Sequence, residues 1–343
     1  MPNPTGLNTL AASREVMARA VDVSICPAAV ETMAQSLAAA VVSHNPIAKH
    51  WLAGAPDKVQ QFLQSLSFGE QALFMLVFHA TGFSYWQDPP WSISDDDTTY
   101  NGSTAWLICL IREQATLKPA LLATLGDDRW HTLTLGVNNI PMPMACERLE
   151  ILRELGKILQ DNNGEKIGVV QRIQNIQQIR RILLTGETGL AAPALALLLA
   201  KTMPGFNDIS NYDELTVPFL KRAQLLVNDI NYLKIKHGMG PISGLDKLTA
   251  FADYKIPQFL RHKNVLRYSQ PLAEKIDKLV PLSAGSKEEV EIRAGTVVAV
   301  EAIRQRLNRT CAMDSGTLDN LLWLEAQKDR AMQPYHRCRT INY

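Results

Sequence analysis

The sequence has little cysteine, almost no net charge and no long hydrophobic run. Its five cysteines are scattered over 343 residues without a Cys-X-X-Cys pair, so neither a disulfide framework nor a zinc site is predicted. The 35 basic and 34 acidic residues leave a net charge of +1, with no excess to neutralise a nucleic-acid backbone. The sequence therefore predicts no duplex nucleic acid as partner, whereas a mononucleotide or nucleoside is compatible with it.

Membrane and targeting signals are missing as well. The longest apolar run, Leu190–Ala200, contains a proline and is too short to span a bilayer. The N-terminus has no basic region followed by an apolar one. We therefore expect a cytoplasmic protein without a membrane partner, and the sequence does not indicate its oligomeric state.

The common motifs of cofactor and metal sites do not occur. There is no P-loop, no GxGxxG after a strand and no GxSxG, and the seven histidines show no HExxH spacing. We therefore predict no cofactor and no metal ion.

Apolar residues recur mainly at the spacing of α-helices. Glu147–Leu159 carries a leucine stripe, and Ser13–Ala40 is rich in alanine, valine and methionine. Ser286-Lys-Glu-Glu289 is a capping box that opens a helix to about Arg309, and its glutamate is expected to accept the serine amide.

These patterns predict a mainly α-helical chain. With 46% hydrophobic residues the chain can bury a sizeable core, and no low-complexity linker divides it. We expect one domain over residues 1–343, with a possible division into an N-terminal helical lobe, 1–160, and a second lobe, 161–343. Few segments alternate apolar and polar residues, so few strands are expected, and Asp88–Asn101 is predicted to be a surface loop.

Thr216–Asn231 is a predicted helix with two polar residues of interest. Thr216 can cap it and Pro218 fits its first turn. Lys221 and Asp229 lie two turns apart on one face, where they can orient each other through an intervening polar group. A solvated helix face is the commoner meaning of such a pattern.

A glycine-rich segment, His237–Gly244, precedes Asp253. The glycines are typical of a simple turn, and equally of backbone amides that approach a phosphate or sugar. If a helix begins near Asp253, the carboxylate caps it, and Pro257 fits the first turn. Caps are much commoner than catalytic aspartates. A helix, a tight turn and a second helix that starts at a carboxylate are nevertheless how some N-glycosylases hold their catalytic acid.

Four aromatic residues lie within Phe83–Trp91. Aromatic faces can stack on a flat base, which is typically worth ~1–3 kcal/mol per base. An aromatic corner of the core is the commoner explanation of such a composition.

Five segments resemble the queuosine salvage family, and they occur in the family's order. They are Phe83-Ser-Tyr-Trp86, Ile140-Pro-Met-Pro-Met144 with Glu147-Arg148, Phe219-Leu-Lys-Arg-Ala-Gln224, Phe251-Ala-Asp-Tyr254 with Ile256-Pro-Gln258, and Glu289-Val-Glu-Ile-Arg-Ala294. The segment His336–Tyr343 is also similar to the family's basic, tyrosine-ended tail. The resemblance implies a mainly helical fold similar to helix-hairpin-helix DNA glycosylases. It also implies hydrolysis of the N-glycosidic bond of queuosine 5'-phosphate, which releases queuine for reuse in tRNA.

The resemblance assigns roles to residues of this sequence. The family's catalytic aspartate matches Asp253, and its lysine matches Lys221. Its base-pocket aromatic matches Phe251, and an upstream histidine matches His50. The residues expected to bind the substrate are His50, Phe83, Asp229, Phe251, Tyr254, Glu325 and Asp329. The last two are acidic side chains that could hydrogen-bond the leaving base.

The sequence departs from the family at two positions. His79 stands where an aspartate is expected four residues before Phe83, and Leu324 stands in place of the aspartate of a Leu-Trp-Asp-Tyr segment. Leu324 would remove a hydrogen-bond acceptor, which Glu325 could replace only with a changed geometry. We therefore expect weaker discrimination among 7-deazapurine nucleotides than a typical member shows.

Three functions are compatible with these patterns. They are a nucleotide N-glycosylase, a non-catalytic nucleotide-binding or base-binding protein on the same scaffold, and a helix-hairpin-helix DNA glycosylase. The balanced charge argues against the third, and the presence of Asp253 and Lys221 argues against the second. In the first, Asp253 meets the positive charge that develops on the ribose. Lys221 then either holds the 5'-phosphate or sets the charge of Asp253.

Overall fold

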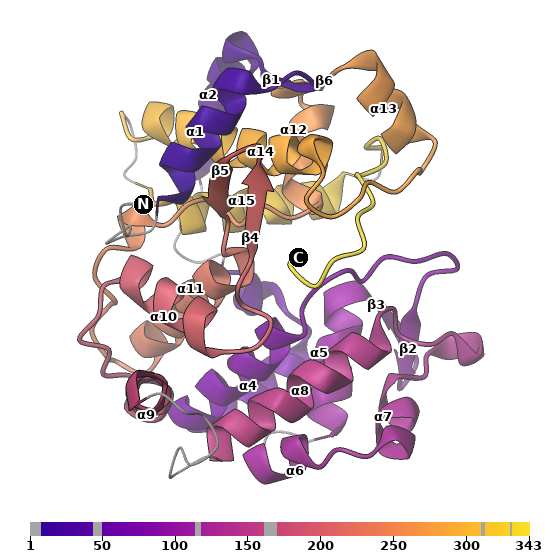
Figure 1. Ribbon diagram of the computed structural model, residues 1–343, viewed down its shortest axis with the longest axis vertical. Helices are drawn as coiled ribbons and strands as arrows, with labels where there is room; N and C mark the ends of the chain where they lie inside the picture. Colours follow the sequence, from indigo (N-terminus) through magenta and orange to yellow (C-terminus); the bar gives the residue numbers. More distant parts are fainter. Residues whose placement is uncertain (1–7, 44–49, 114–117, 161–169, 310–312, 330) are drawn as a thin grey trace.

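The computed structural model describes residues 8–43, 50–113, 118–160, 170–309, 313–329 and 331–343, and most of them are helical (Figure 1). The helices are α1 (Thr9–Arg19), α2 (Pro27–Ser43), α3 (Asp57–Gln64), α4 (Phe68–Ala80), α5 (Gly102–Arg112), α6 (Pro119–Ala123), α7 (Asp127–Thr134), α8 (Ala145–Gln160), α9 (Val170–Thr185), α10 (Ala192–Thr202), α11 (Lys221–Lys236), α12 (Lys255–His262), α13 (Gln270–Asp277), α14 (Lys287–Leu307) and α15 (Ser315–Lys328). The prediction of a mainly helical chain is confirmed. None of the helices in the described ranges is long and apolar enough to cross a membrane.

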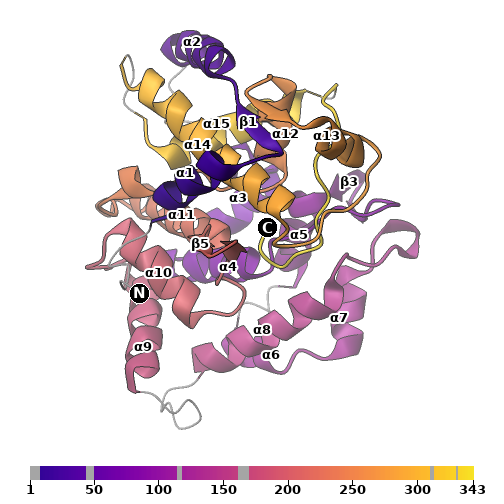
Figure 2. The ribbon, with the colours of Figure 1, turned by 45° about the horizontal axis from the view of Figure 1, so that its top comes forward.

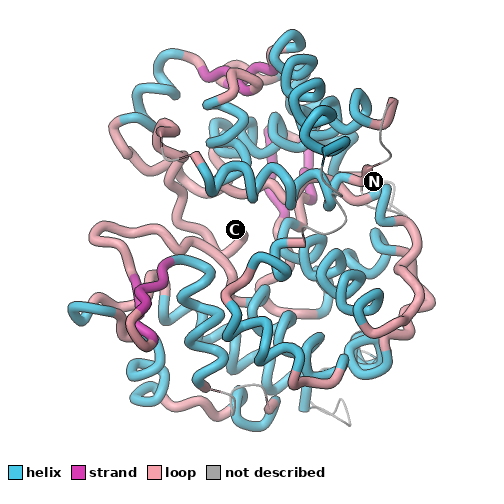
Figure 3. Tube along the Cα trace, turned by 180° about the vertical axis from the view of Figure 1, so that it is seen from behind, coloured by secondary structure: helices cyan, strands magenta, loops and turns pink. Residues whose placement is uncertain are grey.

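The strands are short and form two-stranded antiparallel sheets (Figure 3). The pairs are β1 (Val23–Ile25) with β6 (Leu266–Tyr268), β2 (Ser92–Asp95) with β3 (Thr98–Asn101), and β4 (Ile209–Tyr212) with β5 (Leu215–Pro218). The β2–β3 hairpin lies where a surface loop was expected, over Asp88–Asn101, so that prediction is wrong for its second half. Asp96 adopts a left-handed turn conformation, φ +50°, and Ile93 is buried. These two features allow the chain to reverse and pair.

The buried apolar side chains form two main groups. The larger body gathers residues from 51 to 206 and from 220 to 248. The smaller body gathers residues 10–38 and 250–332, together with residues 212–219 of the β4–β5 hairpin. The N-terminal helices α1 and α2 pack on α14 of the smaller body, as Figure 2 shows for α1. A division at residue 160 does not match this grouping, because α8 and α9, on either side of it, share the core of the larger body.

The helix expected over Thr216–Asn231 begins later than predicted. Thr216 pairs with Asn211 in the β4–β5 hairpin, so it is a strand residue and not a cap. Leu220 adopts a left-handed conformation, φ +48°, and α11 starts at Lys221. The Asp208 carboxylate accepts the Lys221 amide at 3.0 Å and takes the place of the expected cap.

The capping box at the start of α14 is half confirmed. Ser286 accepts the amide of Glu289 as expected. The Glu289 carboxylate does not reach the Ser286 amide, which bonds instead to the Ser283 carbonyl. The Glu289 carboxylate accepts hydrogen bonds from the Gly285 amide and from the Tyr343 hydroxyl. The bond from Tyr343 forms because the C-terminal segment runs between the two bodies and brings that tyrosine alongside α14 (Figure 1).

The glycine-rich segment after α11 does not form a tight two-helix hairpin. Residues 237–254 separate α11 from α12 and include a 3-10 turn at Leu245–Lys247. Gly238 and Gly244 have φ values of +69° and +74°, which a side-chain-bearing residue rarely adopts. Their backbone therefore serves the turn, and neither glycine is among the described residues that line the cavity at the site.

Candidate active site

A cavity of about 350 Å³ lies between the two bodies. The larger body contributes α4, the start of α5 and the first turns of α11, and the smaller body contributes the start of α12 and one face of α15. The titratable and aromatic residues along the wall include Trp51, His79, Phe83, Tyr85, Lys221, Phe251, Asp253, Tyr254, Lys255, Asp319, Trp323, Tyr335 and Tyr343. Both predicted catalytic residues therefore open to the same space.

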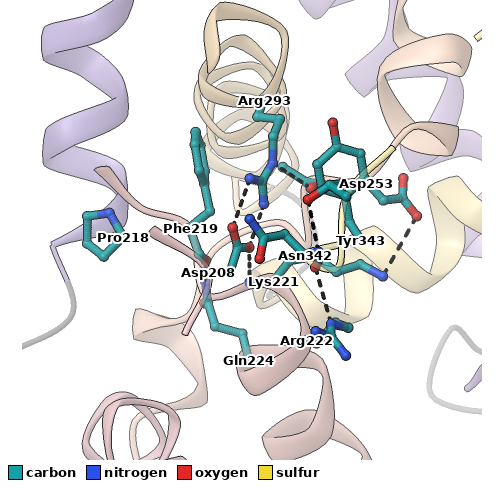
Figure 4. Close-up of polar contacts among 12 residues, drawn as sticks. Asp208, Pro218, Phe219, Lys221, Arg222, Gln224, Asp253, Arg293, Asn342 and Tyr343 are labelled. Atoms are coloured by element: carbon teal, nitrogen blue, oxygen red, sulfur yellow. Dashed lines mark hydrogen bonds and ion pairs between the residues drawn. The ribbon is translucent and has the colours of Figure 1, made fainter. Parts of the chain in front are cut away.

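Lys221 and Asp253 meet at the floor of the cavity. The ammonium nitrogen of Lys221 lies 4.0 Å from Oδ2 of Asp253, and both side chains are largely buried (Figure 4). Burial lowers the pKa of Lys221, and the negative charge of Asp253 opposes that shift. The pair is thus a closely spaced ion pair whose members still have free hydrogen-bonding capacity.

Asp253 is a helix cap as well as a cavity residue. Its Oδ1 accepts the backbone amides of Lys255 at 2.7 Å and Ile256 at 3.0 Å, and Pro257 lies in the first turn of α12 as expected. These bonds leave Oδ2 facing Lys221. The two interpretations of Asp253 are therefore compatible, because capping fixes one oxygen and frees the other.

A buried ion pair next to Lys221 and Asp253 joins α14 to the segment that precedes α11. Arg293 of α14 binds Asp208 through two hydrogen bonds, at 2.9 and 2.6 Å (Figure 4). Arg293 also donates to the carbonyl of Ala252, and Asp208 accepts the amide of Lys221. One fork-shaped contact thus positions the residue before Asp253 and the backbone of Lys221 at the same time.

Asp319 is the functional candidate that the sequence interpretation missed. It lies in the first turns of α15, lines the cavity and accepts the Phe251 amide at 2.9 Å. Burial, reinforced by the neighbouring Asp253 carboxylate, raises the pKa of Asp319 well above its usual value. The raised pKa favours the protonated form of Asp319, which can donate a proton. The sequence contained one signal for Asp319. It lies four residues before Trp323, which also lines the cavity, and residues at that spacing share one face of a helix.

Glu325 and Asp329 are not among the described residues that line this cavity, so the structure does not bring them together with Lys221 and Asp253. They line a separate groove between α2, α12 and α15. Glu325 pairs with Lys328, and Asp329 pairs with His262. Leu324 is not among the described residues that line the cavity either. The helical phase of α15 is the reason, because Asp319 and Trp323 occupy the face toward the site.

The aromatic segment divides between core and cavity. Phe83 and Tyr85 line the cavity, whereas Trp91 is buried in the larger body. The ring of Phe83 lies 4.3 Å from the guanidinium of Arg148 and 5.0 Å from that of Arg222. Phe83 is only 1% exposed, so it forms the back of the wall rather than a free stacking face.

The smaller body contributes two of the predicted binding residues. Phe251 and Tyr254 flank Asp253, and both line the cavity. The Tyr254 ring also lies 4.9 Å from that of Tyr335. These rings give the cavity a flat, apolar side next to the Asp253 carboxylate.

Asp229 and His50 belong to a buried polar cluster behind the cavity wall. The Asp229 carboxylate is bound by His50 at 3.1 Å, His79 at 2.7 Å and the indole of Trp51 at 3.1 Å. Burial favours its neutral form, but the hydrogen bonds from the two histidines lower the pKa of Asp229 to about 2. Asp229 therefore orients Trp51 and His79, which line the cavity. Its buried contacts differ from the solvated helix face that is commoner for such a pattern, and an indirect link to Lys221 stays a prediction.

A carboxylate, a lysine and a second carboxyl group with a raised pKa in an aromatic cavity are typical of a site for acid–base or electrostatic chemistry on a small planar ligand. The sequence model of the family described as queuosine salvage protein matches residues 66–343. A relative in Sphaerobacter thermophilus, named queuosine 5'-phosphate N-glycosylase/hydrolase, is 33% identical over 347 residues, which cover 98% of each chain. A relative of the same name in Mus musculus is 29% identical over 291 residues, 79% of this chain and 81% of its own. The chain belongs to the queuosine salvage protein family.

Proposed function

We propose that this enzyme hydrolyses the N-glycosidic bond of queuosine 5'-phosphate, or of a related 7-deazapurine nucleotide, and releases the free base for tRNA modification. The observation that carries the proposal is the Asp253–Lys221 pair beside Asp319 in one cavity of a chain from this family. A cytoplasmic site of action stays a prediction.

Asp253 has the position of the charge-stabilising group. Cleavage of a ribosyl C–N bond builds positive charge on the anomeric carbon and ring oxygen. A carboxylate fixed by two backbone amides needs no reorganisation to meet that charge. Lys221, 4.0 Å away, sets the local charge around Asp253 or holds the phosphate, and both functions require the lysine to be protonated.

Asp319 has the position of the acid that helps the base to leave. A 7-deazapurine lacks the ring nitrogen at position 7 that ordinary purines can protonate, so leaving-group help must reach another edge. Asp319 is buried beside Phe251, and its raised pKa favours the neutral form that a general acid needs. We assign to it the role that the sequence interpretation gave to Glu325 or Asp329.

The segments α11 and α12 take the part that a helix-hairpin-helix unit plays in DNA glycosylases. Lys221 is the first residue of α11 and Asp253 caps α12, so the connection between the helices brings both to one cavity. The ligand in this proposal is a nucleotide and not duplex DNA, because a net charge of +1 offers little attraction to a duplex.

The test is incubation of the purified protein with queuosine 5'-phosphate, with free queuine measured by chromatography and mass spectrometry. Guanosine 5'-phosphate serves as the control nucleotide, and the unphosphorylated nucleoside shows whether the phosphate is required. Release of queuine from queuosine 5'-phosphate, with little release of guanine, is the expected result. A protein that binds queuosine 5'-phosphate in calorimetry without releasing base would instead be a binding protein.

A further inference from the structure

His79 projects from α4, lines the cavity beside Trp51 and binds Asp229 of α11. Asp229 is eight residues beyond Lys221 on α11, a rise of about 12 Å along the helix. In the orientation that the proposed function requires, the sugar of the ligand lies at Asp253 and its base extends along α11, so that the far edge of the base, or a substituent on that edge, points toward His79.

The hydrogen bond to Asp229 fixes which ring nitrogen of His79 carries the proton. The Asp229 carboxylate is ionised and only accepts hydrogen bonds, so Nε2 of His79 must donate at 2.7 Å. Burial lowers the pKa of His79 in spite of that bond, so the imidazole is neutral. Nδ1 is then unprotonated and can only accept a hydrogen bond.

The acceptor at Nδ1 has no protein partner. Among the residues that the structure describes, none is in hydrogen-bond contact with this nitrogen, although His79 is only 2% exposed. The other groups of the cluster are satisfied, because Asp229 receives three donors and Nδ1 of His50 accepts the Leu52 amide. His79 thus holds the free polar atom of this cluster on the cavity side.

We infer that His79 determines specificity by accepting, through Nδ1, a hydrogen bond from an amine or hydroxyl carried on the far edge of the bound base. The inference rests on the proposed function for the orientation of the ligand. Asp229 is the positioning residue, because it sets the tautomer and the direction of the ring. A neutral imidazole does not favour a cationic amine over a hydroxyl as a carboxylate would. Because Leu324 is not among the described residues that line the cavity, His79 is the one of the two departures from the family that can act on discrimination among 7-deazapurine nucleotides there.

The experiment compares two nucleotides that differ only in that edge. Queuosine 5'-phosphate carries a substituent with an amine and hydroxyls at position 7, and 7-deazaguanosine 5'-phosphate carries none. The value of kcat/KM for base release and the dissociation constant are measured for both nucleotides with His79→Phe, His79→Leu and His79→Gln. His131→Phe, on the exposed face of α7, is the matched control.

His79→Phe should lower the preference for the substituted nucleotide about tenfold, because one hydrogen bond and its desolvated partner are lost. His79→Gln should restore most of that preference, because its amide can donate to Asp229 while its carbonyl accepts. His79→Leu provides the same deletion if the phenylalanine variant does not fold, and melting temperatures identify that case. An unchanged preference in a folded deletion variant would overturn the inference.

The two proposals fail in different ways. A wild-type protein that releases base from neither nucleotide contradicts the proposed function, and the ratio of the two dissociation constants still tests His79. A wild-type protein that releases base, with both nucleotides affected equally by His79→Phe and by His79→Gln, contradicts only the inference about His79.

Discussion

Two clusters of polar residues at the cavity treat buried carboxyl groups differently. In the cluster behind the cavity wall, the Asp229 carboxylate is bound by two histidines and an indole, and its pKa falls to about 2. In the cluster that lines the cavity, Asp253 and Asp319 share one lysine, which lies 4.0 Å from Asp253, and the pKa of Asp319 is raised well above its usual value.

The difference distinguishes a carboxylate that stabilises the fold from carboxyl groups that are available to a ligand. A buried charge with every hydrogen bond made is fixed in place and stabilises the fold. Neighbouring carboxyl groups with few hydrogen-bond partners destabilise each other's charged forms, and such clusters are common at functional sites. The same residue type therefore has opposite effects in the two clusters, which the following substitutions can test.

The largest effect is expected for Asp253→Asn. Loss of the negative charge should slow base release about 100–1000-fold, the range found when one preorganised charge-stabilising group is removed. The melting temperature should change little, because the asparagine oxygen can still accept the Lys255 and Ile256 amides. Single-turnover base release and thermal unfolding measure the two quantities. Near-normal turnover in a stable variant would reduce Asp253 to a helix cap.

Asp319→Asn should slow base release about 100-fold, because asparagine cannot transfer a proton. Although the variant should lose activity, its free energy of unfolding at neutral pH should increase. A folded pKa above the unfolded value means that Asp319 contributes stability at low pH, which is lost as pH rises. The variant should therefore be more stable than the wild type at pH 7 and equal to it near pH 3. Melting curves at both pH values decide this, and a less stable variant at pH 7 would contradict the assignment of a neutral acid.

Asp229→Asn should destabilise the protein at neutral pH. A pKa lowered from 3.8 to about 2 corresponds to about 2 kcal/mol of stability, present above pH 4 and lost as pH falls through 2. Urea unfolding at pH 7 measures the loss. Together with Asp319→Asn, this variant would show that replacing two buried carboxyl groups, one lining the cavity and one behind its wall, changes the free energy of unfolding at pH 7 in opposite directions. If both variants change the free energy of unfolding at pH 7 in the same direction, the contrast between the Asp229 cluster and the Asp253–Asp319 cluster is wrong.

Trp51→Phe should have the smallest effect. It removes one N–H donor to Asp229, while both histidines stay in place. We expect a loss of about 1 kcal/mol in the free energy of unfolding and less than a fivefold change in kcat/KM. A much larger loss of stability would mean that the two histidines do not satisfy Asp229 by themselves.

The sequence predicted the Lys221–Asp253 pair better than its surroundings. Lys221 and Asp253 lie inside short segments with a recognisable pattern, so resemblance brings them together without any geometry. Asp319 lies outside those segments, and its side of α15 depends on where that helix begins, at Ser315. Glu325 is two residues beyond Trp323, a rotation of about 200° around the helix, so it lines the other groove and not the cavity.

The helices were also easier to predict than the connections between them. The stripe in α8 and the cap of α14 follow from local periodicity and local hydrogen bonding. Ser84, Met144 and Leu220 have positive φ values, and each lies in a segment that resembles the family. Periodicity gives no information on such backbone turns, because they are stabilised by distant partners such as Asp208.

The Asp208–Arg293 contact also determines when the site can exist during folding. It joins residues 85 positions apart, and it links the backbone of Lys221 to that of Ala252, next to Asp253. Contacts of long sequence separation form after local helices, because loop closure has to come first. The helices of either body can therefore form while the cavity is still absent. During refolding, recovery of helical circular dichroism should precede recovery of nucleotide binding.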